Sequence, residues 1–341
     1  MNVAMIMSQD RLSQEHAMLN RLVVGLIDNG SHVIRIVPEF STEEMPLYEQ
    51  AVSLATRVNI PMPVAHLLQS ERKILLTEQC KKNNVDAIVC FGSDALQAAT
   101  DVGTAIDIPV LSEVVSMQEA SKVRKSKTVW RWLASTPSME ETIARRVGEE
   151  RVALVPMGVS TLTIEKETSD TSRHSQCAIV LDADGDLKQT ASVLRALQKY
   201  PNVHIFLEVL QSKNRRVWKL IHQLVMHDRV TCLSDISSLR SLVPHADVLM
   251  LPSAKMPLRT VLLEAMAQRV PVICTSMPGF DMLIDEHTAL FSNNSWDYAL
   301  ALVLDDPTIA TRISEEGAAC IEKKYASSIQ IAAFEAAFTL I

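Results

Sequence analysis

The sequence predicts an α/β protein built from two doubly wound, parallel-sheet domains. Short apolar segments alternate with amphipathic segments along the whole chain, which is the pattern of repeated βαβ units. A length of 341 residues favours two domains over one. Residues 158–176 are rich in Ser and Thr and separate two halves of the alternation, so they are the predicted linker.

The first half, residues 1–157, predicts one Rossmann-like domain. Its apolar segments predict strands at Val3–Met7, Val33–Val37, Ala87–Phe91, Pro109–Leu111, Val129–Ala134 and Val152–Val155. Between them, Glu15–Asp28, Arg72–Asn83 and Met139–Arg146 carry apolar residues three and four positions apart, which is typical of amphipathic helices.

The second half, residues 177–325, repeats the scheme and predicts a second Rossmann-like domain. Its predicted strands are Ala178–Leu181, Ile205–Val209, Val230–Leu233, Val248–Leu251 and Val272–Cys274. The last segment, residues 326–341, reads as an apolar helix in which Glu335 is the only charge. We expect this helix to pack back on the N-terminal domain.

The composition restricts the class of protein. It is 48% apolar and 21% charged, as in soluble proteins, and the net charge of −7 argues against nucleic-acid binding. No apolar run reaches the ~18 residues of a membrane span, and the six cysteines form no C-x-x-C pair, so we expect a cytoplasmic protein with reduced thiols. The nine glycines form no Gly-Gly or Gly-x-Gly, which disfavours glycine-rich phosphate loops and dinucleotide-dependent oxidoreductases.

Leu251–Cys274, with the sequence LPSAKMPLRTVLLEAMAQRVPVIC, is the most informative segment. An apolar strand ends in Pro-Ser, a loop follows, and a helix carries the acid Glu264 before Pro271 opens another strand. In an open parallel sheet, ligands bind beyond the carboxyl ends of the strands, where loops lead into helix N-termini. A carboxylate two turns into such a helix can reach a ribose hydroxyl.

This segment closely resembles the donor-site signature of retaining glycosyltransferase family 4, in which Pro-Ser, a Glu, seven residues and Glu-Ala-Met-Ala are followed by Pro-Val. Further similar segments occur in the family's order at Gly30–Val33, Asp86–Val110, Val155–Val159, Asp228–Val230, Ala246–Val248 and Pro278–Phe280. The resemblance covers most of the chain. It implies the GT-B fold, in which two Rossmann-like domains face each other across a cleft, with an acceptor-side domain at 1–157 and a nucleotide-sugar donor domain at 177–325.

The resemblance also assigns candidate binding residues. Glu264 matches the Glu that contacts the donor ribose; the alternative is a helix residue on a solvated face. Lys188 matches the Lys that neutralises the donor diphosphate; the alternative is a surface lysine. The family's accompanying Arg is missing at or near Ala183.

Two positions depart from the family. Met256 stands where a Glu holds sugar hydroxyls, and a thioether cannot accept charge-assisted hydrogen bonds, so a different or absent donor sugar follows. Arg259 stands where the family has a glycine near the diphosphate. It replaces the missing phosphate contact, fills the pocket, or is exposed to solvent in the first helical turn.

The resemblance implies a transferase that moves a hexose from a nucleotide sugar with retention of configuration, without a metal or other cofactor. The acceptor would be a glycan or a lipid-linked molecule, and the sequence identifies no catalytic residue. The alternative is a catalytically inactive pseudo-glycosyltransferase that binds a partner or serves as a scaffold. Lys122–Trp132, KVRKSKTVWRW, is either a peripheral contact with the inner face of a membrane or a solvated loop leading into a buried strand.

Overall fold

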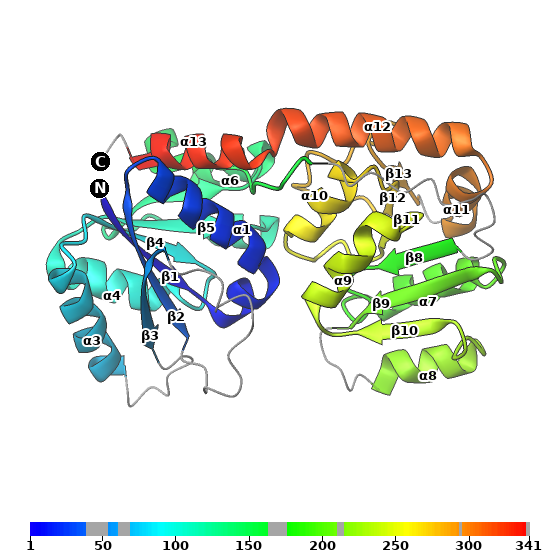
Figure 1. The fold of residues 1–341 in the computed structure, drawn as a ribbon, viewed down its shortest axis with the longest axis horizontal. Helices are drawn as coiled ribbons and strands as arrows, with labels where there is room; N and C mark the ends of the chain where they lie inside the picture. The colour runs from blue at the N-terminus through cyan, green and yellow to red at the C-terminus, as the bar shows by residue number, and fades with distance from the viewer. Residues whose placement is uncertain (39–53, 61–68, 163–175, 210–214, 293–294, 339–341) are drawn as a thin grey trace. The chain divides into compact units, whose positions relative to one another are not determined.

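The computed structural model describes residues 1–38, 54–60, 69–162, 176–209, 215–292 and 295–338. The chain divides into two compact units, each with its own parallel sheet (Figure 1). Unit 1 comprises described residues of Met1–Gly158 and of Ser327–Ile341, and unit 2 those of Val159–Ala326. Of the predicted linker, residues 163–175 lie outside the described residues.

The sheet of unit 1 has seven parallel strands in the order β3-β2-β1-β4-β5-β6-β7. They are β1 (Asn2–Met7), β2 (His32–Pro38), β3 (Thr56–Ile60), β4 (Ala87–Phe91), β5 (Val110–Val114), β6 (Val129–Ala134) and β7 (Val152–Leu154). Its helices are α1 (Gln9–Asp28), α3 (Gln69–Lys82), α4 (Leu96–Ile106), α5 (Met117–Ala120), α6 (Pro137–Val147), the 3-10 turn η2 (Glu149–Arg151) and α13 (Ser327–Phe338). The inner strands β1 and β4 are buried and, except for Asn2, apolar, which is typical of parallel strands with helices on both faces of the sheet.

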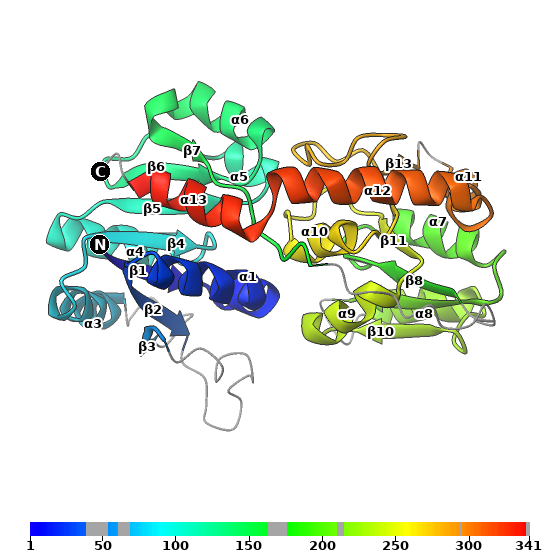
Figure 2. The same cartoon turned by 45° about the horizontal axis from the view of Figure 1, so that its top comes forward.

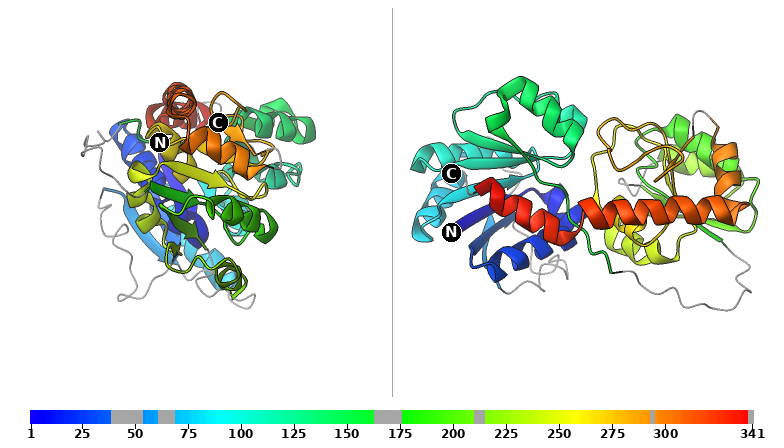
Figure 3. Two further views of the ribbon diagram at one scale, coloured as in Figure 1. Left: turned by 90° about the vertical axis from the view of Figure 1, so that its right-hand side faces the viewer. Right: turned by 90° about the horizontal axis from the view of Figure 1, so that it is seen from above.

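The C-terminal helix α13 belongs to unit 1 and lies beside α1 (Figure 2, Figure 3). The ring of Phe334 is fully buried and stacks on Phe91, with the ring centroids 6.2 Å apart. The buried Arg131 of β6 donates from Nη1 to the Ala337 carbonyl over 3.0 Å. The stacking of Phe334 and the hydrogen bond from Arg131 make α13 part of the unit 1 core.

The sheet of unit 2 has six parallel strands in the order β10-β9-β8-β11-β12-β13. They are β8 (Gln176–Val180), β9 (Val203–Glu208), β10 (Val230–Leu233), β11 (Val248–Leu251), β12 (Val272–Cys274) and β13 (Leu290–Phe291). Its helices are α7 (Leu187–Leu197), α8 (Arg215–Gln223), α9 (Ile236–Leu242), the 3-10 turn η3 (Val243–His245), α10 (Thr260–Ala267), α11 (Trp296–Leu304) and α12 (Pro307–Lys324).

The predicted fold class of two Rossmann-like parallel-sheet domains is confirmed. The prediction was wrong about one helix start and missed one strand. Helix α1 begins at Gln9, not near Glu15, because the Ser8 hydroxyl caps it by accepting from the Arg11 N–H, and Glu15 itself has non-helical angles of φ −122° and ψ 19°. Strand β3 was missed because its sequence TRVNI is polar and lies at the edge of the sheet. Among the described residues, no helix is both long and apolar enough to span a bilayer.

Candidate functional site

The candidate binding residues of unit 2 lie where its parallel strands end. Strand β8 ends at Val180 and leads into α7, and its neighbour β11 ends at Leu251 and leads into α10. Both helices therefore begin beyond the carboxyl ends of paired strands. This edge is where open parallel sheets bind ligands.

Arg259 is the N-cap residue of α10, and its guanidinium is buried inside unit 2. It donates from Nη1 to Oε2 of Glu208 over 2.7 Å and from Nη2 to Oε1 over 2.5 Å. The two side chains are 3% and 4% exposed. The alternative that Arg259 is exposed in the first helical turn is therefore wrong, because a bidentate ion pair with the last residue of β9 holds it in the interior.

The Glu208 carboxylate also contacts the loop between β8 and α7. Its Oε2 accepts from the Asp182 N–H over 3.0 Å, and the Glu208 carbonyl accepts from the Ala183 N–H, also over 3.0 Å. Asp182 has a left-handed φ of 49°, which turns the loop backbone toward this acid. The Glu208 carboxylate thus lies between the Asp182 N–H and the Arg259 guanidinium, two donors that bind an anion.

Asp182 adds a second acid at the same edge. Burial raises the pKa of its carboxyl, and the charges of Glu208 and Asp184 raise it further, against the opposing effects of the Ser253 hydrogen bond and of Arg259. The excess of negative charge in this loop opposes the approach of a free anion. Arg259 is the group that counters it.

The N-termini of the two helices differ in how they are capped. Asp186 caps α7 by accepting from the N–H groups of Lys188 and Gln189, both over 3.1 Å. Helix α10 has no side-chain cap hydrogen bond, and its N-cap residue is the cation Arg259. The α10 N-terminus therefore presents the positive end of its dipole to an anion, while Glu208 balances the Arg259 charge beside it.

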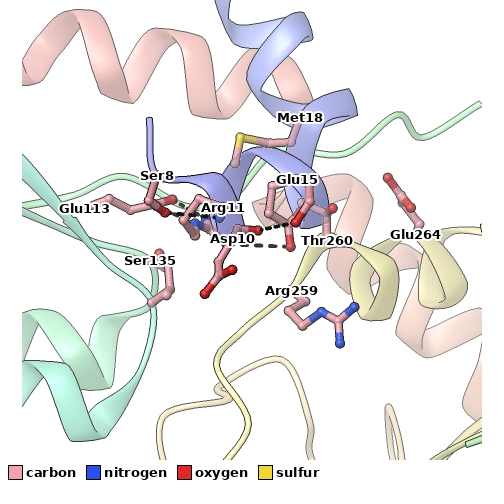
Figure 4. Close-up of polar contacts among 12 residues, drawn as sticks. Ser8, Asp10, Arg11, Glu15, Met18, Glu113, Ser135, Arg259, Thr260 and Glu264 are labelled. Atoms are coloured by element: carbon pink, nitrogen blue, oxygen red, sulfur yellow. Dashed lines mark hydrogen bonds and ion pairs between the residues drawn. The ribbon is translucent and has the colours of Figure 1, made fainter. Parts of the chain in front are cut away.

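Glu264 lies in the second turn of α10 and is held by α9. The Arg240 guanidinium donates from Nε to Glu264 Oε2 over 2.9 Å and from Nη2 to the Thr260 hydroxyl over 2.6 Å. The Glu264 side chain is 19% exposed, so it lies at the surface of the unit yet is fixed in orientation. Arg259 and Glu264 extend in different directions from the start of α10 (Figure 4).

The other two candidates have contrasting environments. Lys188 is exposed in the first turn of α7 and shares the edge of the sheet with α10. Met256 is buried, 4% exposed, in the loop before α10. The structure thus brings Lys188, Arg259 and Glu264 to one edge of unit 2, while the Met256 thioether is part of the apolar interior.

In unit 1, the N-terminal part of α1 and strand β5 form a second buried ion-pair cluster (Figure 4). Arg11 donates from Nε to Glu113 Oε2 over 3.0 Å and from Nη2 to Oε1 over 2.7 Å, and its Nη1 lies 3.6 Å from Glu15 Oε1. Burial disfavours the Arg11 charge, yet the two carboxylates outweigh burial and raise the pKa of the guanidinium. Glu15 is part of this interior cluster and is fully buried.

Segment Lys122–Trp132 divides between surface and interior. Lys122, Arg124, Lys125 and Lys127 are exposed, and Trp130 is partly exposed with the Arg151 guanidinium 5.4 Å from its ring centroid. By contrast, Trp132 is buried and belongs to β6. One of the two tryptophans therefore belongs to the core.

Sequence reasoning missed Glu208 and Arg240, which hold the candidate residues of unit 2, and Glu113, which pairs with Arg11 in unit 1. For Glu208 a signal existed, since an acid at the end of an apolar strand points to the ligand-binding edge of a parallel sheet. Arg240 and Glu113 gave no such signal, because their roles depend on contacts 24 and 102 residues away in sequence.

Residues 188–305 match the sequence model of the family described as Glycosyl transferases group 1. The matched region runs from the first turn of α7 to the end of α11 and contains Lys188, Arg259 and Glu264. No curated protein sequence matches the chain.

Solved structures share the fold over the whole chain. The Anabaena protein Alr3699/HepE, solved in complex with UDP and glucose, is 12% identical, with all of both chains covered and a TM-score of 0.79. Sucrose-phosphate synthase from Thermosynechococcus elongatus is 17% identical, with 100% of this chain and 99% of that chain covered and a TM-score of 0.76. UDP-GlcNAc 2-epimerase from Neisseria meningitidis is 12% identical, with all of both chains covered and a TM-score of 0.68. These similarities establish the two-domain fold of the GT-B glycosyltransferases, which an epimerase also uses.

Within the described part of the chain, no group of three or more His, Cys, Asp or Glu side chains is arranged to hold a metal ion. The polar groups collected at the edge of unit 2 are instead suited to a ligand that combines an anion with hydroxyl groups.

Proposed function

We propose that the protein is a glycosyltransferase that transfers a hexose from a nucleotide sugar, with the donor bound at the carboxyl edge of the unit 2 sheet. The observation that carries the proposal is the match of residues 188–305 to the glycosyl transferases group 1 family, in a region that contains all four candidate residues. The uncapped α10 N-terminus beside Arg259 supports an anionic ligand at the same place.

Each residue then has a distinct task. The fixed Glu264 carboxylate accepts hydrogen bonds from the two ribose hydroxyls of the donor. The α10 N-terminus and the exposed Lys188 stabilise the diphosphate, and Arg259, paired with Glu208, fixes the β8–α7 loop beside it. When the bond between the sugar anomeric carbon and the diphosphate oxygen breaks, the bonding pair leaves with the nucleoside diphosphate, and these positive groups stabilise the charge that develops.

Uridine is the base to test first. Two relatives of the same fold were solved with UDP, Alr3699/HepE and Staphylococcus aureus TarM. We therefore propose UDP-hexose as the donor class, transferred with retention and without a metal ion. A glycan or lipid-linked molecule is the proposed acceptor.

Calorimetric titration of the full chain tests donor binding. We expect micromolar binding of UDP and weaker binding of GDP and ADP. Glu264→Gln removes one charge-assisted acceptor and is expected to weaken UDP binding about tenfold or more, as the loss of ~1.5–3 kcal/mol implies. Glu315→Gln, an exposed position on α12, is the matched control and is expected to have no effect.

Failure of all three nucleotides to bind a protein that unfolds cooperatively would refute the donor site. If UDP binds, proton NMR of the transfer product tests retention through the anomeric coupling constant. EDTA is expected to leave the rate unchanged, and a lost rate restored by Mg²⁺ would contradict the metal-independent mechanism.

The second candidate is a pseudo-glycosyltransferase that keeps the fold without turnover. Two observations favour it: the buried Met256 at a sugar-binding position and the Glu208 carboxylate already paired with Arg259. UDP binding without hydrolysis or transfer of any tested UDP-hexose would support this candidate over the enzyme.

Lys122–Trp132 is a proposed peripheral contact with an anionic membrane, where lipid-linked acceptors lie. Its exposed cations support the proposal. Co-sedimentation with phosphatidylglycerol vesicles that weakens with added salt is the expected result, and salt-independent or absent sedimentation would contradict it.

A further inference from the structure

Unit 1 has a groove that the candidate donor site does not use. It has a volume of about 460 Å³ and is lined by residues of α4 and of the segment that follows α5. Helix α5 has only four residues, where α4 and α6 on the neighbouring connections have eleven each. This short crossover helix leaves part of the sheet around β5 and β6 without a full helical cover.

The floor of the groove is apolar. Leu96 of α4, Val114 of β5, and Val129 and Trp132 of β6 line it. A second cavity of about 140 Å³ shares Val129 and Trp132 with the groove and extends to Val147. Lys125, Glu150 and Arg151 also line this second cavity, so the apolar floor is that of the groove itself, from Leu96 to Trp132. The groove volume of about 460 Å³ leaves room for a hydrocarbon chain.

The rim of the groove is cationic. Lys122, Arg124 and Lys125 line it and are exposed. The two acids of the lining are engaged elsewhere: Glu113 pairs with Arg11, and Glu119 Oε2 accepts from the Val115 N–H over 3.0 Å. Three cations beside an apolar floor are complementary to a molecule with one anionic end and one apolar end.

We infer that this groove binds a single-chain anionic amphiphile, with its phosphate or carboxylate at Lys122, Arg124 and Lys125 and its hydrocarbon chain along Leu96, Val129 and Trp132. The site is separate from the α10 site of unit 2. Its occupation requires no nucleotide, so it can be tested whether or not the proposed transfer activity holds.

Titration of the full chain with monomeric octyl, decyl and dodecyl phosphate tests both ends of the ligand. Each added methylene is expected to strengthen binding about fourfold, since burial of one such group stabilises by ~0.8 kcal/mol. Inorganic phosphate and dodecyltrimethylammonium are expected not to bind. A change in tryptophan emission on binding that is absent in Trp132→Phe would place the chain in the groove.

Two pairs of variants locate the site. Lys122→Ala/Arg124→Ala/Lys125→Ala is expected to weaken dodecyl phosphate binding at least tenfold. The equal charge change Lys73→Ala/Lys81→Ala/Lys82→Ala on exposed positions of α3 is expected to leave it unchanged. All six positions are exposed, so neither triple variant disturbs the core.

Gln97 lines the groove and is exposed on α4. Gln97→Trp is expected to block the groove and abolish binding, whereas Gln97→Ala retains it. Equal effects of the two triple variants, binding that does not depend on chain length, or binding only to phosphatidylglycerol vesicles and not to monomeric dodecyl phosphate would each overturn the inference.

Discussion

Removing the Arg259 charge is expected to destabilise unit 2 strongly. In Arg259→Met the Glu208 carboxylate loses both guanidinium hydrogen bonds, of 2.5 and 2.7 Å, and keeps the Asp182 N–H. Its side chain is 4% exposed, so water cannot replace the lost partner. Breaking a buried pair in this way costs about 3–5 kcal/mol of unfolding free energy, which for a unit of this size corresponds to a fall in Tm of roughly 6–20 °C.

Urea denaturation followed by circular dichroism and tryptophan fluorescence measures this change. Trp218 and Trp296 report on unit 2, and Trp130 and Trp132 on unit 1. The matched control is Arg195→Met, which removes an exposed guanidinium of α7 and is expected to change the free energy of unfolding by less than about 0.5 kcal/mol.

The double variant Arg259→Met/Glu208→Gln shows whether the lost stability comes from the unpaired Glu208 charge or from the lost packing of the Arg259 side chain. The amide oxygen of Gln still accepts from the Asp182 N–H, and no buried charge remains, so most of the lost stability is expected to return. A cost below about 1 kcal/mol for Arg259→Met, or a double variant as unstable as the sum of the two single ones, would refute the ion-pair argument.

Three further predictions concern stability. The folded-state pKa of Asp182 is raised, so the folded protein binds this proton more tightly than the unfolded chain, and stability falls as the pH rises above the unfolded-state pKa of about 4. In urea titrations, Asp182→Asn should therefore be more stable than wild type at pH 7. This advantage should vanish below about pH 4. Phe334→Ala removes a buried ring stacked on Phe91 and should cost unit 1 about 3–5 kcal/mol, measured in the same titrations. Gly158→Ala would place a Cβ 2.8 Å from the Ser327 Cα and should cost about 1–3 kcal/mol, and an unchanged urea midpoint would contradict the close approach.

The fold class followed from the sequence because parallel sheets require apolar strands, and their periodicity is local information. The helix start at Gln9 and the strand β3 were missed for equally local reasons. The SQDRLSQEH segment contains few apolar residues, and TRVNI alternates polar side chains at a sheet edge. The first segment lacks the hydrophobic period on which the prediction depended, and in TRVNI the alternation of apolar and polar residues extends over only five residues.

The candidate site could be predicted in position but not in its internal contacts. The strand-loop-helix pattern placed Glu264 and Arg259 at the start of one helix, and the structure agrees. Their partners come from other elements, Arg240 from α9 and Glu208 from β9. Long-range pairs of this kind depend on the three-dimensional order of the strands, which residue spacing along one chain does not specify.

The Glu208–Arg259 pair bears directly on how a diphosphate could bind unit 2. Arg259 is the buried cation at the uncapped α10 N-terminus, and Glu208 already gives it a bidentate partner. A diphosphate that takes over Arg259 must leave Glu208 without that partner beside Asp182, another acid, which opposes binding. Donor binding is therefore favoured where the diphosphate uses the α10 backbone N–H groups and Lys188 while the ion pair stays intact. In that arrangement Arg259 holds Glu208, which in turn fixes the β8–α7 loop through the Asp182 N–H. Arg259 then makes no direct contact with the ligand, and Glu208 neutralises its charge.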